Sequence, residues 1–116
     1  MNAQHRITIE PAATAISVHA GARQLARSDA ALVLRENGYA PVYYVPRGDV
    51  DMTALSPAQH ATHCPYKGDA SYFDLAGAEA IANIAWSYET PLDSVAAITG
   101  HLAFYADKCD IRVAGQ

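Results

Sequence analysis

Hydrophobic and polar residues alternate over most of this chain, and a period of two predicts β-strands rather than helices. Gly21 interrupts the first alternating run, and Asn37-Gly38 is a strong two-residue hairpin signal further on. The strands expected in this half of the chain cover residues 15–20, 23–27, 30–36 and 42–45. We expect these strands to form an antiparallel meander.

The second half predicts more strands, at residues 71–75 and 82–88, because apolar and aromatic residues alternate with polar ones there. Residues 101–106 and 109–113 are expected to pair as a hairpin about Asp107-Lys108, since that register places apolar residues on one face. These elements extend the antiparallel pattern to the end of the chain.

Two helical segments are expected. Ser56-Pro57 has a cap residue followed by a proline suited to a first helical position, which predicts one helical turn to about Ala61 and an irregular segment after it. A helix over residues 91–99 is predicted with Thr90 as N-cap, Asp93 completing a capping box and Gly100 just beyond its end.

These elements together predict a mainly β fold, either a compact antiparallel two-sheet domain or a partly open barrel, with one short helix near residues 91–99. The length of 116 residues suits a single domain, and half of the residues are hydrophobic (51%), enough for a core. Residues 1–14 are expected to form a loosely attached N-terminal segment.

Charge and cysteine content exclude several classes of protein. A net charge of −4 with only 8 Lys and Arg gives no general attraction to nucleic acid or to an anionic membrane. There is no apolar run long enough to span a bilayer, and residues 1–10 lack the apolar core of a signal peptide. Two cysteines are too few for a disulfide scaffold, so we expect a cytoplasmic protein without a cofactor.

The residues with the most chemistry are concentrated between His60 and Tyr72, and three interpretations compete there. Cys64 could act as a nucleophile if Lys67 or His63 lowered the pKa of its thiol, although a lone cysteine is more often a packed hydrophobe. Lys67-Gly68 could bind an anion, or could form a solvated turn. A third interpretation is a metal site built from residues of suitable ligand types, but their spacing matches no zinc pattern: His60, His63, Cys64, His101 and Cys109.

Glu36 is a second candidate. It shares a strand face with Leu32 and Leu34, and a carboxylate among apolar residues needs a partner or a raised pKa. Arg23 and Lys67 are candidate partners. The alternative is that Glu36 lies in water at the end of its hairpin.

The chain is rich in aromatic residues for its size, and aromatic side chains with a few polar groups commonly line ligand pockets. The alternative is that they pack in the core or on sheet faces. The aromatic set comprises Tyr43, Tyr44, Tyr66, Tyr72, Trp86, Tyr88 and Tyr105.

Several blocks of sequence resemble the family known as domain of unknown function 427, over about residues 18–113. The most specific block is Cys64-Pro65-Tyr66-Lys67-Gly68, and residues 41–46, 85–88 and 100–105 add weaker matches. The resemblance implies a compact, mostly antiparallel β domain. The family is sometimes labelled nucleotidyltransferase-like, but the metal motif of those enzymes is missing: residues 49–51 have only its Asp-x-Asp spacing.

We therefore expect one pocket that joins the segment 64–72 to the strand of Glu36, and we expect it to bind a small organic molecule. Lys67, Glu36 and Cys64 are the candidate catalytic residues if the protein is instead an enzyme. A third alternative is a non-catalytic interaction module or homo-oligomer. The candidate ligand-binding residues are Arg23, Tyr44, Tyr66, Tyr72, Trp86 and Tyr88.

Overall fold

The computed structural model describes residues 6–77 and 80–114. The described strands form three antiparallel sheets that do not close into a barrel, which confirms the mainly β fold and adds a sheet to the two expected. Within the described residues, no helix is long and apolar enough to cross a membrane.

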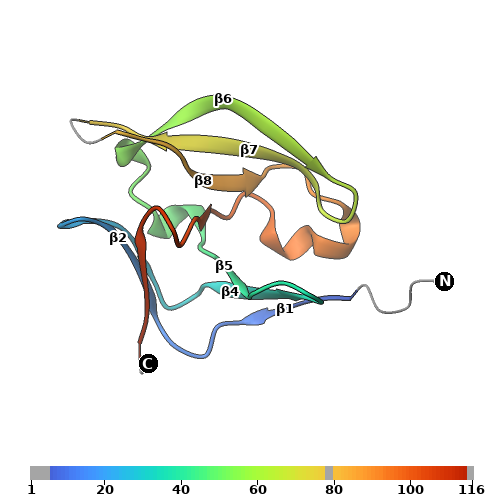
Figure 1. The fold of residues 1–116 in the computed structure, drawn as a ribbon. Coiled ribbons are helices and arrows are strands. Elements are labelled where there is room, and N and C mark those ends of the chain that lie inside the picture. Colours follow the sequence, from blue (N-terminus) through green and yellow to red (C-terminus); the bar gives the residue numbers. More distant parts are fainter. Residues whose placement is uncertain (1–5, 78–79, 115–116) are drawn as a thin grey trace.

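The first sheet has the order β1-β4-β5 and is the lower layer of Figure 1. It consists of β1 (Ile7–Pro11), β4 (Leu32–Glu36) and β5 (Val42–Tyr44). Strands β4 and β5 form the expected hairpin about Asn37-Gly38, where Gly38 adopts a φ of 86° that favours glycine. The N-terminal segment, which was expected to be loosely attached, includes β1, and β1 pairs with β4 over its whole length.

The second sheet has the order β10-β2-β3, with β2 (Ile16–Ala20), β3 (Arg23–Ser28) and β10 (Asp110–Val113). The turn at Gly21 joins β2 to β3 as the alternation predicts. The single meander expected for the first half of the chain is wrong, however. Strands β3 and β4 belong to different sheets, because β4 pairs with β1 and β5 instead.

The third sheet is the upper layer of Figure 1 and has the order β6-β7-β8-β9. Its strands are β6 (Leu55–Cys64), β7 (Gly68–Leu75), β8 (Ile81–Tyr88) and β9 (Ala103–Phe104). A two-way backbone hydrogen-bonded bridge between Val45 and Leu102, at 2.7 and 2.8 Å, ties the end of β5 to the start of β9. The first and third sheets are therefore linked at one edge and face each other across the molecule.

Two groups of buried side chains hold the sheets together. One group packs the second sheet against the third, with Val18, Leu25 and Ile84 almost fully buried. The other packs the first sheet against the third, and Leu34 and Tyr44 belong to it. Burial of each such side chain contributes roughly 1.5–3 kcal/mol, so these contacts fix how the sheets are placed.

In the part of the chain that the structure describes, three short 3-10 helices connect the strands: η1 (Arg47–Asp49), η2 (Met52–Ala54) and η3 (Asp93–Ile98). The helix expected over residues 91–99 corresponds to η3, but it is shorter and is interrupted at Val95, whose backbone is not helical. The predicted capping box is wrong, since Leu92 is the N-cap and no side chain caps the helix. Burial of Val95 and Ile98 against the core holds the segment in place instead.

The helical turn predicted from Ser56-Pro57 to Ala61 is also wrong, as is the irregular segment expected after it. Both belong to β6, which extends from Leu55 to Cys64. Pro57 is compatible with this strand because β6 lies at the edge of its sheet, where a missing backbone N–H can face solvent.

The hairpin predicted about Asp107-Lys108 does not form. A turn is present at residues 106–108, but β9 before it pairs with β8, and β10 after it pairs with β2. The two segments therefore belong to different sheets. Their apolar faces pack against strands that are distant in sequence, which the local pattern could not distinguish from pairing with each other.

Candidate functional site

A cavity of about 430 Å³ lies between the first and third sheets. Two hairpin turns border it: the turn between β4 and β5 contributes Tyr39 and Ala40, and the turn between β6 and β7 contributes Pro65, Tyr66 and Lys67. The strands supply the remaining walls, with both aromatic and aliphatic side chains. The cavity thus draws together segments that are far apart in the sequence.

Lys67 and Glu36 meet at this cavity. The Lys67 Nζ donates a hydrogen bond to the Glu36 Oε1 at 2.8 Å, and their side chains are only 13% and 11% exposed. Glu36 ends β4 in the first sheet, and Lys67 lies in the turn that leads into β7 of the third. The proximity expected of these two residues is confirmed, and Glu36 is not in open water.

The backbone around Lys67 fixes its position. The backbone carbonyl oxygen of Lys67 accepts a hydrogen bond from the Leu92 N–H at 3.0 Å. The backbone N–H of Lys67 donates to the carbonyl oxygen of Cys64 at 3.2 Å. Gly68 follows with a φ of 115°, in a region that side-chain-bearing residues rarely adopt. The Gly68 Cα also lies against Pro91, since an added Cβ would come within 3.4 Å of the Pro91 Cα.

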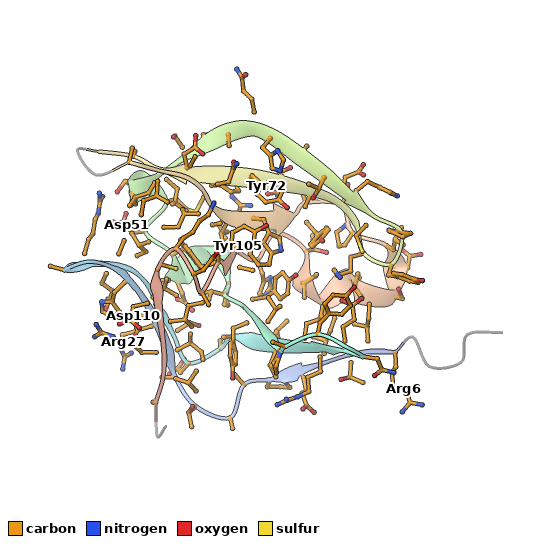
Figure 2. The ribbon with its side chains drawn as sticks, viewed as in Figure 1. Arg6, Arg27, Asp51, Tyr72, Tyr105 and Asp110 are labelled. Atoms are coloured by element: carbon orange, nitrogen blue, oxygen red, sulfur yellow. The ribbon has the colours of Figure 1, made fainter. Side chains whose placement is uncertain are left out.

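Five aromatic side chains form the inner walls. Trp86 packs against Tyr105, with ring centroids 4.5 Å apart, and stands perpendicular to Tyr44 at 6.4 Å. Tyr72 and Tyr105 lie nearly parallel at 6.4 Å, and Figure 2 places both on the side of the upper sheet that faces β4 and β5. Tyr88 also lines the cavity and is buried.

Hydrogen bonds fix the polar ends of these rings. The Trp86 Nε1 donates to the Tyr44 hydroxyl at 3.3 Å, and the Tyr105 hydroxyl donates to the Tyr72 hydroxyl at 3.4 Å. The Tyr72 hydroxyl is also 3.0 Å from the Thr62 hydroxyl. The walls are therefore ordered by polar contacts as well as by packing.

Burial shifts the ionisation of several groups around the cavity. It raises the pKa of Tyr44 and of Tyr105 to about 12, and it also raises the pKa of Tyr88. Burial alone would lower the pKa of Lys67, but the hydrogen bond to Glu36 and the electrostatic effect of Cys64 outweigh it, so the pKa is raised. At neutral pH these tyrosines are phenols and Lys67 is an ammonium ion.

Cys64 ends β6 and lines the same cavity as a half-buried free thiol. Cys109 lies elsewhere, where its thiol donates to the Tyr105 carbonyl oxygen. Burial and the neighbouring carboxylates raise the pKa of Cys109 to about 11. Of the two thiols, only Cys64 is placed to meet a molecule in the cavity.

Arg23 is the candidate that the structure does not bring to this cavity. It begins β3 in the second sheet, and its guanidinium lies 3.9 Å from the Asp51 carboxylate. The prediction that Arg23 shares the pocket is therefore wrong, because β3 and β4 separate into different sheets. The candidates that do line the cavity are Tyr44, Tyr66, Tyr72, Trp86, Tyr88, Lys67, Glu36 and Cys64.

The histidines of the metal interpretation are dispersed. His63 pairs with Asp69 at 2.7 Å on the exposed part of the β6–β7 hairpin, and His60 packs against the Tyr72 ring. Over residues 6–77 and 80–114, no three His, Cys, Asp or Glu side chains are grouped as metal ligands.

Two aromatic residues of the cavity were not among the predicted site residues. Tyr105 follows β9 and was expected within the hairpin about Asp107-Lys108, but that hairpin does not form and the Tyr105 ring packs against Trp86. Tyr39 follows the Asn37-Gly38 turn and is 71% exposed at the cavity rim. A tyrosine at the tip of a hairpin was the only sequence signal for Tyr39, and it is a weak one.

The fold and the site define a class of protein: an antiparallel β domain with an aromatic cavity that a Lys–Glu pair lines. Residues 8–115 match the model of the family described as domain of unknown function (DUF427), and the chain belongs to that family. A comparison with curated proteins finds no match.

Proposed function

We propose that this protein binds a small organic molecule in the cavity between its first and third sheets. One observation carries the proposal. Aromatic side chains and one ion pair, from segments far apart in the sequence, surround one cavity of about 430 Å³. Pockets of roughly 300–1,000 Å³ with apolar walls and a few polar groups are typical ligand sites. Simple core packing would instead fill such a space with side chains.

The rim of the cavity supports the same proposal. Among the described residues, the exposed large hydrophobic side chains are Tyr39, Tyr66 and Leu92, and the two tyrosines both lie at this cavity. Exposed aromatic residues that gather at one place are typical of binding sites, whereas scattered ones are not. Tyr39 and Tyr66 come from opposite hairpins and would contact the outer part of a bound molecule.

Binding is favoured over acid–base catalysis by the ionisation of the site. A general acid or base works best with a pKa near the operating pH. The pKa values of Lys67 and Tyr44 are raised instead, away from neutrality, so both groups keep their protons. Because Lys67 and Tyr44 stay protonated at neutral pH, both remain hydrogen-bond donors to a bound molecule, as ligand recognition requires.

The experiment is a titration of the ¹⁵N-labelled protein with phenol and benzene, followed by NMR. The chain has one tryptophan, so its indole N–H gives one resonance that reports directly on the cavity wall. We expect a saturable shift of the Trp86 indole resonance. The proposal is wrong if that resonance stays unchanged up to the solubility limit of both probes.

Two half-buried tyrosines provide a matched control. Tyr105 lines the cavity and Tyr43 does not, because Tyr43 lies on the opposite face of β5 from Tyr44. Tyr105→Ala should weaken probe binding about tenfold, which corresponds to the loss of one aromatic contact of about 1.4 kcal/mol. Tyr43→Ala should leave it unchanged. Equal effects of the two substitutions would contradict binding in this cavity.

A further inference from the structure

The Lys67–Glu36 pair is the charged part of an otherwise aromatic wall. Of the described residues that line the cavity, only these two and His63 carry an ionisable basic or carboxylate group, and His63 is paired with Asp69. The Lys67 Nζ and the Glu36 Oε1 are 2.8 Å apart. The cavity therefore presents a strong donor and a strong acceptor side by side, with no net charge.

Such a pair disfavours charged ligands. An anion would attract Lys67 but repel Glu36, and a cation would do the reverse. Displacing either partner would break this ion pair in a site that is largely shielded from water, which is costly. A neutral ligand avoids this cost, because an ammonium carries three donors and a carboxylate has about four acceptor positions.

The spacing of the two atoms selects among neutral groups. From standard bond lengths, the oxygen and nitrogen of one amide are about 2.2 Å apart. An amide edge with both atoms on one side could therefore accept from Lys67 and donate to Glu36 through two nearly parallel hydrogen bonds, across atoms 2.8 Å apart. An open-chain secondary amide cannot do so, because its trans geometry points the N–H and C=O in opposite directions.

The aromatic walls restrict the rest of the molecule. Trp86, Tyr44 and Tyr105 offer ring faces and edges within one small space, and a flat ring stacks on such surfaces with little loss of internal freedom. A ring also holds an amide in the cis geometry that the ion pair requires. The ion pair and the aromatic walls thus both favour a flat ring that contains a cis amide.

We propose that the cavity binds neutral, planar cyclic amides, with the carbonyl oxygen on Lys67 and the ring N–H on Glu36. This inference rests on the proposed small-molecule function and names its ligand class. Lys67 and Glu36 are the specificity-determining residues, and the aromatic side chains supply the bulk of the contact area.

The test compares four probes by the shift of the Trp86 indole resonance: 2-pyridone, N-methyl-2-pyridone, benzoate and benzylammonium. We expect 2-pyridone to bind most tightly. N-methyl-2-pyridone should bind about tenfold or more weakly, because methylation removes the hydrogen bond to the Glu36 carboxylate. Tighter binding of N-methyl-2-pyridone, benzoate or benzylammonium would overturn the inference.

The double variant Lys67→Met/Glu36→Leu keeps the packing volume and removes both charges. In this variant the preference for 2-pyridone over its N-methyl form should disappear, while binding of benzene should persist. If benzene binds the native protein but 2-pyridone gains nothing over its N-methyl form, the amide inference fails and the small-molecule function stands. If neither benzene nor any of the four probes shifts Trp86, both fail.

Discussion

The Lys67 Nζ donates to the Glu36 Oε1 across 2.8 Å, although the two residues are 31 positions apart and belong to different sheets. The pair bridges the β6–β7 turn to the end of β4. It thereby joins the two hairpin ends that border the aromatic cavity. Breaking the ion pair should therefore affect both the stability of the fold and the shape of the cavity.

Removing one partner of this pair should destabilise the fold more than removing both. We expect Lys67→Met to lower the free energy of unfolding by roughly 2–4 kcal/mol, because it leaves Glu36 without its ammonium partner at 11% exposure. The double variant Lys67→Met/Glu36→Leu should lie within about 1 kcal/mol of the native protein, since it leaves no unpaired charge. Urea denaturation measures both. A single variant as stable as the double one would contradict this account.

Stability should fall in alkaline solution. The pKa of Tyr44 is about 12 in the fold against an ordinary value of 10.0, so the native state holds its proton more tightly than the unfolded chain does. This contribution is complete below pH 10 and is lost as the pH rises towards 12. Lys67 acts in the same direction, because its pKa is also raised and its favourable charge is lost at high pH.

The Tyr44→Phe variant tests this dependence. It should reduce the loss of stability between pH 8 and pH 11 by about 1.4 kcal/mol, because pH 11 lies one unit above the unfolded pKa of Tyr44 and one unit below its folded pKa of about 12. The measurement is urea denaturation at pH 8 and pH 11. Tyr39→Phe, at an exposed tyrosine, is the control and should follow the native protein. Parallel pH profiles for Tyr44→Phe and the native protein would refute the assignment.

The two thiols should differ in alkylation. Cys109, studied in a Cys64→Ser variant, has a pKa raised from 9.0 to about 11 by burial and by the charges of Asp110 and Asp107. At pH 8 it should react with iodoacetamide about a hundredfold more slowly than an unperturbed thiol, because only the thiolate reacts. Its rate should still be rising at pH 10. A plateau near pH 9 would be inconsistent with a buried thiol.

Cys64, studied in a Cys109→Ser variant, decides between binding and covalent chemistry. The binding proposal predicts no acceleration over a model thiol of the same exposure. Rapid alkylation with an apparent pKa well below about 8.5 would instead favour a nucleophilic role for Cys64.

Gly68 should be intolerant of substitution. Gly68→Ala places a Cβ at a φ of 115°, 3.4 Å from the Pro91 Cα and close to other backbone atoms. Such strain costs about 1–3 kcal/mol, and it should also weaken ligand binding because Lys67 precedes this residue. Gly48→Ala is the matched control: nothing lies within 4 Å of its added Cβ, so a change within about 0.5 kcal/mol is expected. If thermal unfolding showed equal losses of stability for the two variants, the backbone strain expected at position 68 would be contradicted.

Elements defined by nearby residues could be predicted well. The β2–β3 and β4–β5 hairpins follow from alternation and from glycines at tight turns, and both are present. Strand β8 follows from the alternation around Trp86. In each case, the alternating residues and turn glycines that predict the element lie within it. The local sequence is therefore enough to predict the element.

Elements that depend on distant partners could not be predicted. Pro57 suggested a helix start, but pairing with β7 makes this segment an edge strand. The apolar faces of β9 and β10 suited each other, yet β9 pairs with β8 and β10 pairs with β2, which places the two strands in different sheets. Arg23 and Lys67 were equal candidates for Glu36, and the separation of β3 from β4 left only Lys67 within reach.

By itself, the sequence determined that this protein is an antiparallel β structure of the DUF427 family, with its chemistry concentrated around Lys67 and its aromatic residues. Alternation and turn glycines are local, so the residues alone carry that information. Only the tertiary structure decided which sheets face each other, and hence that Glu36, Trp86 and Tyr105 share one cavity with Lys67. That choice depends on packing between residues far apart in the chain, and a local pattern contains no information about it.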